Sequence, residues 1–149
     1  MKNIIVKGII FIIIGFYLGH VIFGTKIELA RKINKKETYY FLQQGVYSDK
    51  ESLKVNSKDL SQKVVDYSNN KYYVYVGITK DKNIAEKIMK IYKEQGISLH
   101  KKEKNINSKE FKSNVEQFDL LINSTNDKDE ILTIEEVVLA NYNEIIKKE

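Results

Sequence analysis

The chain has 149 residues, of which 42% are hydrophobic, with no cysteine and a formal net charge of +5. That length allows one domain with an appendage, and the apolar fraction argues against a chain that is disordered throughout. The lack of cysteine excludes thiol catalysis, disulfide bonds and cysteine-ligated metal sites. All but one of the 25 basic residues are lysine. Because arginine suits phosphate and base-edge recognition better, the charge is only weak evidence for nucleic-acid binding.

The charge is unevenly distributed along the chain. Residues 1–36 carry seven basic side chains and one acidic one, and residues 37–107 carry thirteen and nine. Residues 108–149 carry five basic and ten acidic side chains. The protein is therefore basic near its start and acidic at its end, which separates a first segment, a middle domain and a tail.

The first segment reads IIVKGIIFIIIGFYLGHVIF from Ile4 to Phe23. Twenty residues at about 1.5 Å rise per residue span about 30 Å, the thickness of the hydrocarbon core of a bilayer. A cleavable signal peptide has a shorter apolar stretch and a small-residue cleavage site, which this segment lacks. We predict a transmembrane anchor over residues 1–25, followed by a basic juxtamembrane linker over residues 26–37. No other segment is predicted to span the membrane.

The middle domain, residues 38–104, alternates between strand-like and helix-like patterns. Its aromatic-rich segments alternate in polarity as half-buried strands do, and Ser48 or Asp49 is suited to capping the first helix. SNNK at residues 68–71 is a hairpin-type turn, and Gly96 is suited to ending the second helix. The predicted strands are residues 39–47, 64–67, 72–78 and 97–102, and the predicted helices are residues 48–64 and 82–96.

The two halves of this domain repeat one another. With Gly45 aligned to Gly77, Tyr40 matches Tyr72 and Asp49 matches Asp81. Each half is thus an aromatic strand, a glycine and the start of a helix. The resulting βαββαβ order predicts an α+β, ferredoxin-like fold, in which both helices cover one face of a four-stranded antiparallel sheet.

The second face of the predicted sheet has no helix to cover it. Successive residues of a strand point to opposite faces. If Leu42, Val74 and Val76 face the helices, the outward residues are Phe41, Gln43, Tyr73 and Tyr75. Aromatic rings and an amide on an open sheet would form a platform for ring-shaped ligands, because rings stack and the amide both donates and accepts hydrogen bonds.

The segments FLQQGVYSDKESL and YYVYVGITKDKNIAEKIMKIYKEQG resemble the two halves of a SPOR domain. The resemblance covers about residues 38–104, and Gln43, Gly45 and Gly77 match the glutamine and the two glycines of that pattern. SPOR domains bind peptidoglycan, favouring glycan strands without peptide stems, and are commonly joined to one N-terminal membrane span. The resemblance implies a peptidoglycan site, whose candidate residues are Phe41, Gln43, Tyr72, Tyr73 and Tyr75.

The sequence departs from the SPOR pattern at three places, and these departures bear on affinity for glycan more than on the fold. Val46 replaces the usual serine after the first glycine, Ile78 replaces the proline after the second, and the third strand lacks arginine.

The charges that flank the predicted span bear on its orientation. Five basic residues follow the span and two precede it, and the positive-inside rule would therefore place the domain in the cytoplasm. Wall binding requires the opposite. We expect a single-pass cell-membrane protein with its C-terminal domain outside, because short N-terminal anchors commonly insert that way.

The acidic tail, residues 105–149, is predicted to form a helical hairpin. Its two amphipathic stripes need a partner, which we expect to be each other or the flank of the sheet domain, and otherwise another envelope protein or a second copy. Asn107 and Glu110 are suited to capping the first helix. The stripes are Phe111, Val115, Phe118 and Ile122 in the first helix, and Ile131, Ile134, Val138, Tyr142 and Ile145 in the second.

No catalytic or metal-binding motif is present in the sequence. We therefore expect no enzyme activity, no cofactor and no metal, with His100 a solvated side chain. The leading hypothesis is a membrane-anchored SPOR protein that binds peptidoglycan glycan strands at the envelope or division septum. The alternative is a protein-interaction subunit of a division or sporulation complex with a degenerate SPOR fold. RNA binding shares the βαββαβ order but is disfavoured by the anchor and the single arginine, so no nucleic-acid partner is expected.

Overall fold

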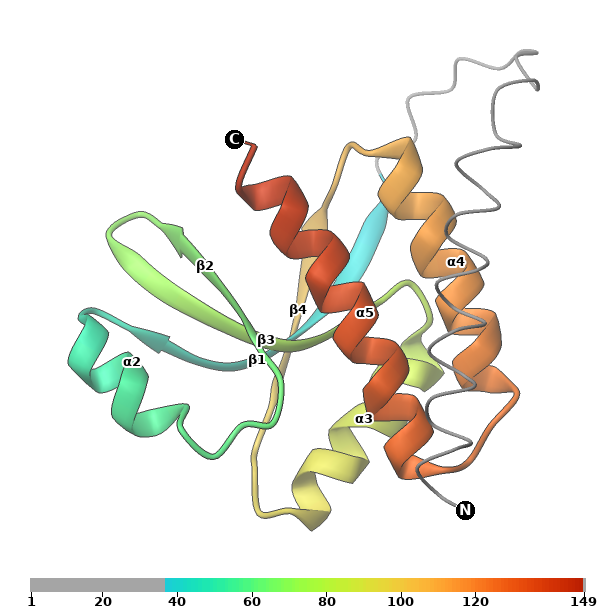
Figure 1. The fold of residues 1–149 in the computed structure, drawn as a ribbon, viewed down its shortest axis with the longest axis horizontal. Coiled ribbons are helices and arrows are strands. Elements are labelled where there is room, and N and C mark those ends of the chain that lie inside the picture. The colour runs from blue at the N-terminus through green and yellow to red at the C-terminus, as the bar shows by residue number, and fades with distance from the viewer. Residues whose placement is uncertain (1–36, 149) are drawn as a thin grey trace. The chain divides into compact units, whose positions relative to one another are not determined.

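The computed structural model describes residues 37–148 and shows an α+β fold with a four-stranded antiparallel sheet and four helices (Figure 1). The predicted order of strands and helices is confirmed, and the strands lie in the order β2-β3-β1-β4. The predicted anchor and residues 26–36 of the linker lie outside the described residues. The elements are β1 (Thr38–Tyr47), α2 (Lys50–Asn56), β2 (Val64–Ser68), β3 (Lys71–Thr79), α3 (Lys82–Glu94), β4 (His100–Asn105), α4 (Lys109–Asn123) and α5 (Lys128–Ile146).

Local sequence signals explain most of the element boundaries. Asp49 caps α2, and Asp81 caps α3 by accepting hydrogen bonds from two backbone N–H groups. Asn69 and Asn70 adopt positive φ values of 51° and 58°, which is the geometry of a tight two-residue hairpin turn. Gly96, with φ of 79°, follows the end of α3 as predicted.

Several boundaries differ from the sequence prediction, and three of these differences have a structural explanation or a different cap. Helix α2 ends at Asn56 instead of continuing to residue 64, and it contains no buried residue, so no apolar face holds a longer helix in place. Strand β4 begins at His100, three residues later than predicted, because the chain first leaves α3 through a loop. Ser108, rather than Asn107, caps α4 by accepting a hydrogen bond from the N–H of Phe111.

Helix α3 covers one face of the sheet. Leu42 lies on this face, opposite Gly77 of β3. A Cβ atom added at Gly77 would lie 3.1 Å from Leu42 Cδ1 and 3.5 Å from Ile88 Cγ2 of α3, so the absence of a side chain lets the helix approach the strand closely. Val74 is fully buried on the same side. The sequence predicts that both helices cover this face; α3 does so, whereas α2 contributes no buried residue.

Helices α4 and α5 cover the opposite face, which the sequence predicted to be open (Figure 1). The rings of Tyr39 and Phe111 lie 5.4 Å apart, and those of Phe41 and Tyr142 lie 5.0 Å apart. The expectation that the tail packs on its own chain is confirmed, and the surface it covers is the face of the sheet as well as its flank. All of the predicted stripe residues are buried except Ile145, which is half-buried.

The tail also completes the edge of β3. Strand β2 pairs with β3 only from Lys71 to Tyr75, so the rest of that β3 edge has no strand beside it. The carboxylate of Glu135 on α5 accepts a hydrogen bond from the N–H of Ile78 at 2.9 Å. Asp119 on α4 accepts from the Thr79 hydroxyl at 2.6 Å and from the N–H of Lys80 at 3.0 Å. Two tail carboxyl groups thus take the place of a missing strand.

Within the described part of the chain, no helix has both the length and the apolar character needed to cross a membrane.

Candidate functional site

Three of the five candidate ligand residues are buried. Phe41 has no exposed surface, Tyr75 retains 3% and Gln43 retains 7%. Tyr72 and Tyr73 are half-buried. The prediction that Phe41, Gln43 and Tyr75 lie exposed was wrong, since all three are buried and Tyr142 of the tail packs on Phe41.

Phe41 and Tyr75 do lie side by side, as the strand alternation predicted. Their ring centroids are 5.0 Å apart in an edge-to-face arrangement, and Tyr142 of α5 packs against Phe41 with the same geometry. The ammonium group of Lys104 lies 4.9 Å from the Phe41 centroid, 5.0 Å from that of Tyr75 and 5.8 Å from that of Tyr142. These four residues form what we call the lysine cage, an aromatic cage of the type that binds cations.

The lysine cage is held by polar contacts as well as by rings. Lys104 Nζ forms an ion pair with Asp66 at 2.9 Å and lies 3.3 Å from the Tyr142 hydroxyl. Burial by itself lowers the pKa of Lys104. The hydrogen bond to Asp66 and the surrounding charges raise this pKa by more than burial lowers it, so the net pKa is above its ordinary value. Burial raises the pKa of Tyr142 to about 12. The cage is therefore occupied by a charged side chain of the same protein, and it offers no free place for a sugar ring or an external cation.

The polar groups at the β3 edge are also closed to solvent. Glu135 is fully buried, and burial raises its pKa to about 8. Burial likewise raises the pKa of Asp119 to about 6, although the hydrogen bonds from Thr79 and Lys80 oppose that shift. At neutral pH Glu135 is largely protonated. Both groups hold the tail in position and neither reaches a surface where a substrate could contact it.

A row of tyrosines remains accessible at the far end of the sheet. Tyr72 lies opposite Tyr47 on one neighbouring strand and opposite Tyr67 on the other. The rings of Tyr67 and Tyr72 are 4.6 Å apart, and Tyr67 is 58% exposed. We call these three residues the tyrosine row. Sequence reasoning found only Tyr72, although the two-residue turn at Asn69 and Asn70 fixes the register that brings Tyr67 opposite it.

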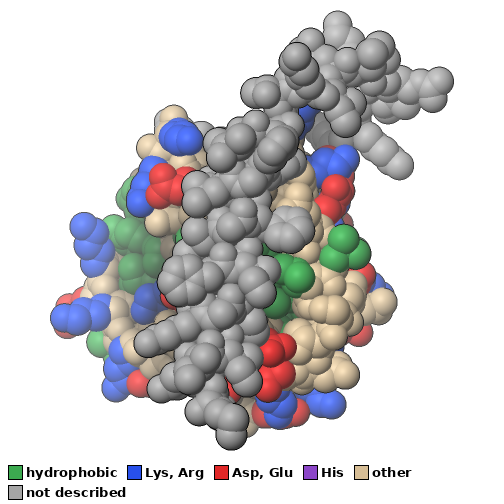
Figure 2. Space-filling view, turned by 45° about the vertical axis from the view of Figure 1, so that its right-hand side comes forward, with side chains coloured by type: hydrophobic (Ala, Val, Ile, Leu, Met, Phe, Trp, Pro, Cys, Tyr) green, Lys and Arg blue, Asp and Glu red, His purple; other side chains and the backbone are tan. Residues whose placement is uncertain are grey.

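The surface around these features carries charges of both signs. Figure 2 shows basic and acidic side chains interspersed on the part of one face that is coloured by residue type. His100 is exposed, as expected for a solvated side chain. Residues 37–148 contain no group of three or more histidine, aspartate or glutamate side chains placed to hold a metal ion.

Comparison of the chain with protein-family models, with curated proteins and with solved structures finds no match.

Proposed function

We propose that this chain is a membrane-anchored, non-catalytic protein-interaction subunit of a cell-envelope complex, built on a degenerate, ferredoxin-like SPOR domain. The resemblance of residues 38–104 to SPOR domains and the apolar first segment support this placement. The βαββαβ element order with strand order β2-β3-β1-β4 agrees with the ferredoxin-like arrangement. The resemblance to SPOR domains, which bind peptidoglycan, favours a position of the domain outside the membrane and a role in division or sporulation.

The observation that carries this proposal is the closed aromatic face. A glycan strand needs exposed rings to stack upon, but Phe41 and Tyr75 are enclosed by Tyr142 and by the Lys104 ammonium. Uncovering them would expose the apolar stripes of α4 and α5 at the same time, which opposes such a change. The surfaces left for recognition are therefore those of the helices, the loops and the sheet edges, which suit a protein partner better than a bare glycan.

The test compares glycan and protein partners with the full chain. In detergent micelles, the chain is sedimented with purified sacculi before and after amidase removes the peptide stems, and we expect no saturable retention in either case. In cells that produce the protein, a photo-crosslinking residue at the exposed position Leu120 or Val55 is expected to yield a discrete protein adduct. Saturable retention that is lost on Gln43→Ala or Tyr75→Ala would contradict the proposal.

The membrane orientation is tested separately. The native chain has no cysteine, so a single Lys102→Cys variant provides one exposed thiol on β4. We expect an impermeant maleimide to label this thiol on intact cells. Labelling only after lysis would place the domain in the cytoplasm and would rule out a role outside the membrane.

Glycan binding through the tyrosine row is a second candidate function. Tyr67 and Tyr72 are exposed enough to contact a ligand, and together with Tyr47 they span three adjacent strands. Aromatic side chains spaced by the strand separation could stack on successive sugar rings. If sacculi do retain the chain, Tyr67→Ala with Tyr72→Ala should abolish retention, whereas Val55→Ala on α2 should leave it unchanged. Equal retention of the double tyrosine variant and of Val55→Ala would exclude the tyrosine row as the glycan-binding site.

A further inference from the structure

The two edge strands of the sheet differ in how they are protected. Strand β4 reads HKKEKN, and its run of charges is the usual means of preventing an edge from pairing with another strand. Strand β2 reads VVDYS, and its single charge, Asp66, is already paired with Lys104. Nothing in the sequence of β2 therefore discourages an additional strand.

The outer side of β2 has backbone groups available for hydrogen bonding. Strand β2 ends the strand order, and its backbone pairs only with β3 in the described residues. The two-residue turn makes Ser68 and Lys71 a hydrogen-bonded pair, and the pattern of antiparallel ladders then alternates along the strand. Val65 and Tyr67 fall at the alternate positions. Their N–H and C=O groups consequently point away from β3, toward the open edge.

A groove runs beside this edge. It has a volume of about 520 Å³ and lies between β2, the loop that precedes β2 and helix α5. Val64, Leu139 and Ala140 provide apolar walls, and Asn143 provides an amide. Peptides that add a strand to a sheet use this combination, in which main-chain hydrogen bonds supply affinity and a pocket for alternate side chains supplies specificity.

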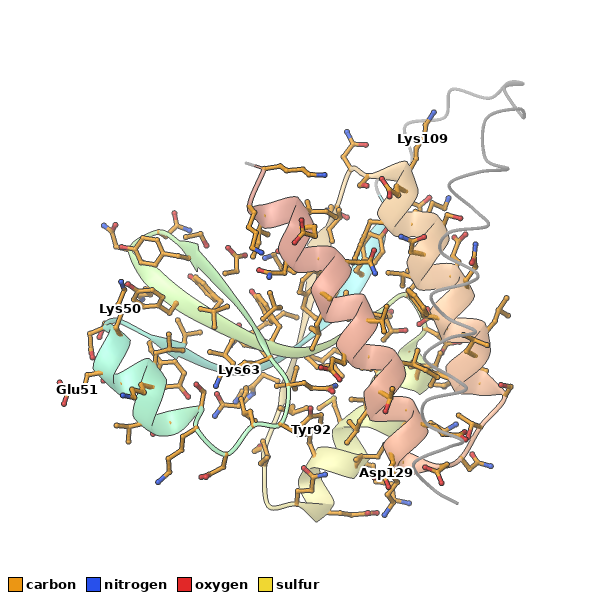
Figure 3. All side chains as sticks on the ribbon, in the orientation of Figure 1. Lys50, Glu51, Lys63, Tyr92, Lys109 and Asp129 are labelled. Atoms are coloured by element: carbon orange, nitrogen blue, oxygen red, sulfur yellow. The ribbon has the colours of Figure 1, made fainter. Side chains whose placement is uncertain are left out.

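Two charged side chains line the groove, the basic Lys63 and the acidic Glu136. Lys63, labelled in Figure 3 in the loop before β2, donates a hydrogen bond to the Ser57 carbonyl at 2.5 Å and is thereby engaged within its own loop. Glu136 of α5 is exposed and, among residues 37–148, takes part in no ion pair. A ligand that places a cation beside Glu136 would gain a complementary charge.

We propose that the β2 edge and the groove beside α5 bind an extended peptide strand of a partner protein, with a valine-sized side chain in the groove and a lysine or arginine beside Glu136. The peptide becomes a fifth strand of the sheet and pairs with the outward groups of Val65 and Tyr67. This inference rests on the proposed interaction function and names the chemical class of the partner.

The experiment uses the full chain, isotope-labelled in detergent micelles, and two synthetic peptides. One is Ser-Thr-Val-Lys-Val-Thr-Val-Ser and the other has glutamate in place of the lysine. We expect the basic peptide to shift the amide signals of Val65 and Tyr67, to slow their exchange with solvent and to bind at least tenfold more tightly than the acidic one. Equal binding, or signal changes confined to other surfaces, would overturn the proposal, as would dimerisation of the chain through β2 in the absence of peptide.

Variants on the same helix provide a matched control. Glu136→Lys should weaken binding of the basic peptide at least tenfold, whereas Glu144→Lys, an exposed position on α5 outside the groove, should change it less than twofold. Val65→Pro removes an outward N–H while leaving the β3 ladder intact, and it should abolish binding. Ala140→Trp, which fills the groove from an exposed helix position, gives an independent test if the proline variant fails to fold.

The outcomes separate this inference from the proposed function. If photo-crosslinks to a protein form in cells while the peptides leave Val65 and Tyr67 unchanged, the groove assignment fails and the interaction function stands. If no crosslink forms and sacculi retain the chain, the interaction function fails regardless of the peptide result.

Discussion

The two faces of the sheet are both buried, but by different kinds of side chain from different parts of the sequence. On the α3 face, Leu42 and Ile88 form an aliphatic interface within the repeated strand–helix units. On the tail face, Phe41 and Tyr75 form an aromatic interface with α5 and enclose a charged lysine. An aromatic strand face is therefore no evidence for a ligand platform when an amphipathic segment elsewhere in the chain has no partner.

The largest expected effect comes from removing a ring at the centre of the tail face. Phe41→Ala removes contacts with Tyr75, Tyr142 and Lys104 at a position with no exposed surface. We expect the free energy of unfolding to fall by about 3–5 kcal/mol, similar to the loss for Leu42→Ala on the other face. Urea unfolding of the full chain in micelles measures both. A loss below about 1 kcal/mol at Phe41 alone would mean that the tail does not pack on this face.

The next largest effect is the pH dependence of the contact between α5 and β3. The pKa of Glu135 is raised to about 8 in the folded protein from an ordinary 4.5, so the folded state prefers the protonated form. Its contribution to stability is therefore full below the ordinary pKa and is lost as pH rises toward 8. Asp119, with its pKa raised to about 6, adds to this loss in the lower part of the range. We expect the free energy of unfolding of the wild-type chain to fall by roughly 3 kcal/mol between about pH 6 and pH 8 through ionisation of Glu135.

Glu135→Gln tests this account because the amide oxygen can still accept the hydrogen bond from Ile78 without ionising. We expect the variant to be more stable than wild type at alkaline pH and to show a flatter stability profile between about pH 7 and 8, above the pKa of Asp119. Glu136→Gln, one residue along α5 and exposed, is the control and should keep the wild-type profile. Identical profiles for wild type and Glu135→Gln would show that Glu135 is not buried against β3.

A smaller effect is expected at the lysine cage. Lys104→Met keeps the aliphatic stem but removes the ammonium group, leaving Asp66 with the Tyr142 hydroxyl but without its ion-pair partner in a half-buried site. We expect a loss of about 1–2 kcal/mol, because a charged hydrogen bond and the cation–π contacts disappear together. Lys102→Met on the same strand is exposed and should change stability by less than about 0.5 kcal/mol. Equal effects of the two substitutions would argue against the cage.

The smallest effect is expected at the tyrosine row, which takes no part in either buried face. Tyr67→Ala removes a ring that is 58% exposed and contacts Tyr72. Thermal unfolding should show a loss of about 0.5 kcal/mol, the lower end of the range for an aromatic pair. A loss comparable to that of Phe41→Ala would mean that the hairpin end of the sheet is covered in the folded protein.

Local patterns in the sequence were sufficient to predict the element order of the fold. Strand alternation, the asparagine turn and the capping residue Asp49 all act within a few residues, and the element order, the turn and the cap predicted from them are confirmed. The apolar stripes of α4 and α5 were also correctly identified. These features depend on backbone geometry and helical periodicity, which a single sequence displays directly.

The sequence did not reveal which surface the tail would cover. Two unpartnered surfaces, the Phe41 face and the tail stripes, were each recognised, but they were assigned to different partners. The polar contacts that join the tail to this face link residues far apart in the sequence, since Tyr142 lies 38 positions from Lys104 and 76 positions from Asp66. No local pattern encodes a contact of that separation. The site prediction failed at Phe41 and Tyr75 for this reason.

Cysteine labelling tests the closed aromatic face most directly, because the native chain has no cysteine. Tyr75→Cys and Tyr72→Cys make the same change three residues apart on β3, at a buried and a half-buried position. With a bulky maleimide and the folded full chain, we predict rapid labelling of the Tyr72 variant and labelling of the Tyr75 variant only at the rate of unfolding. Equally rapid labelling of both under native conditions would contradict the account and reopen this face to glycan.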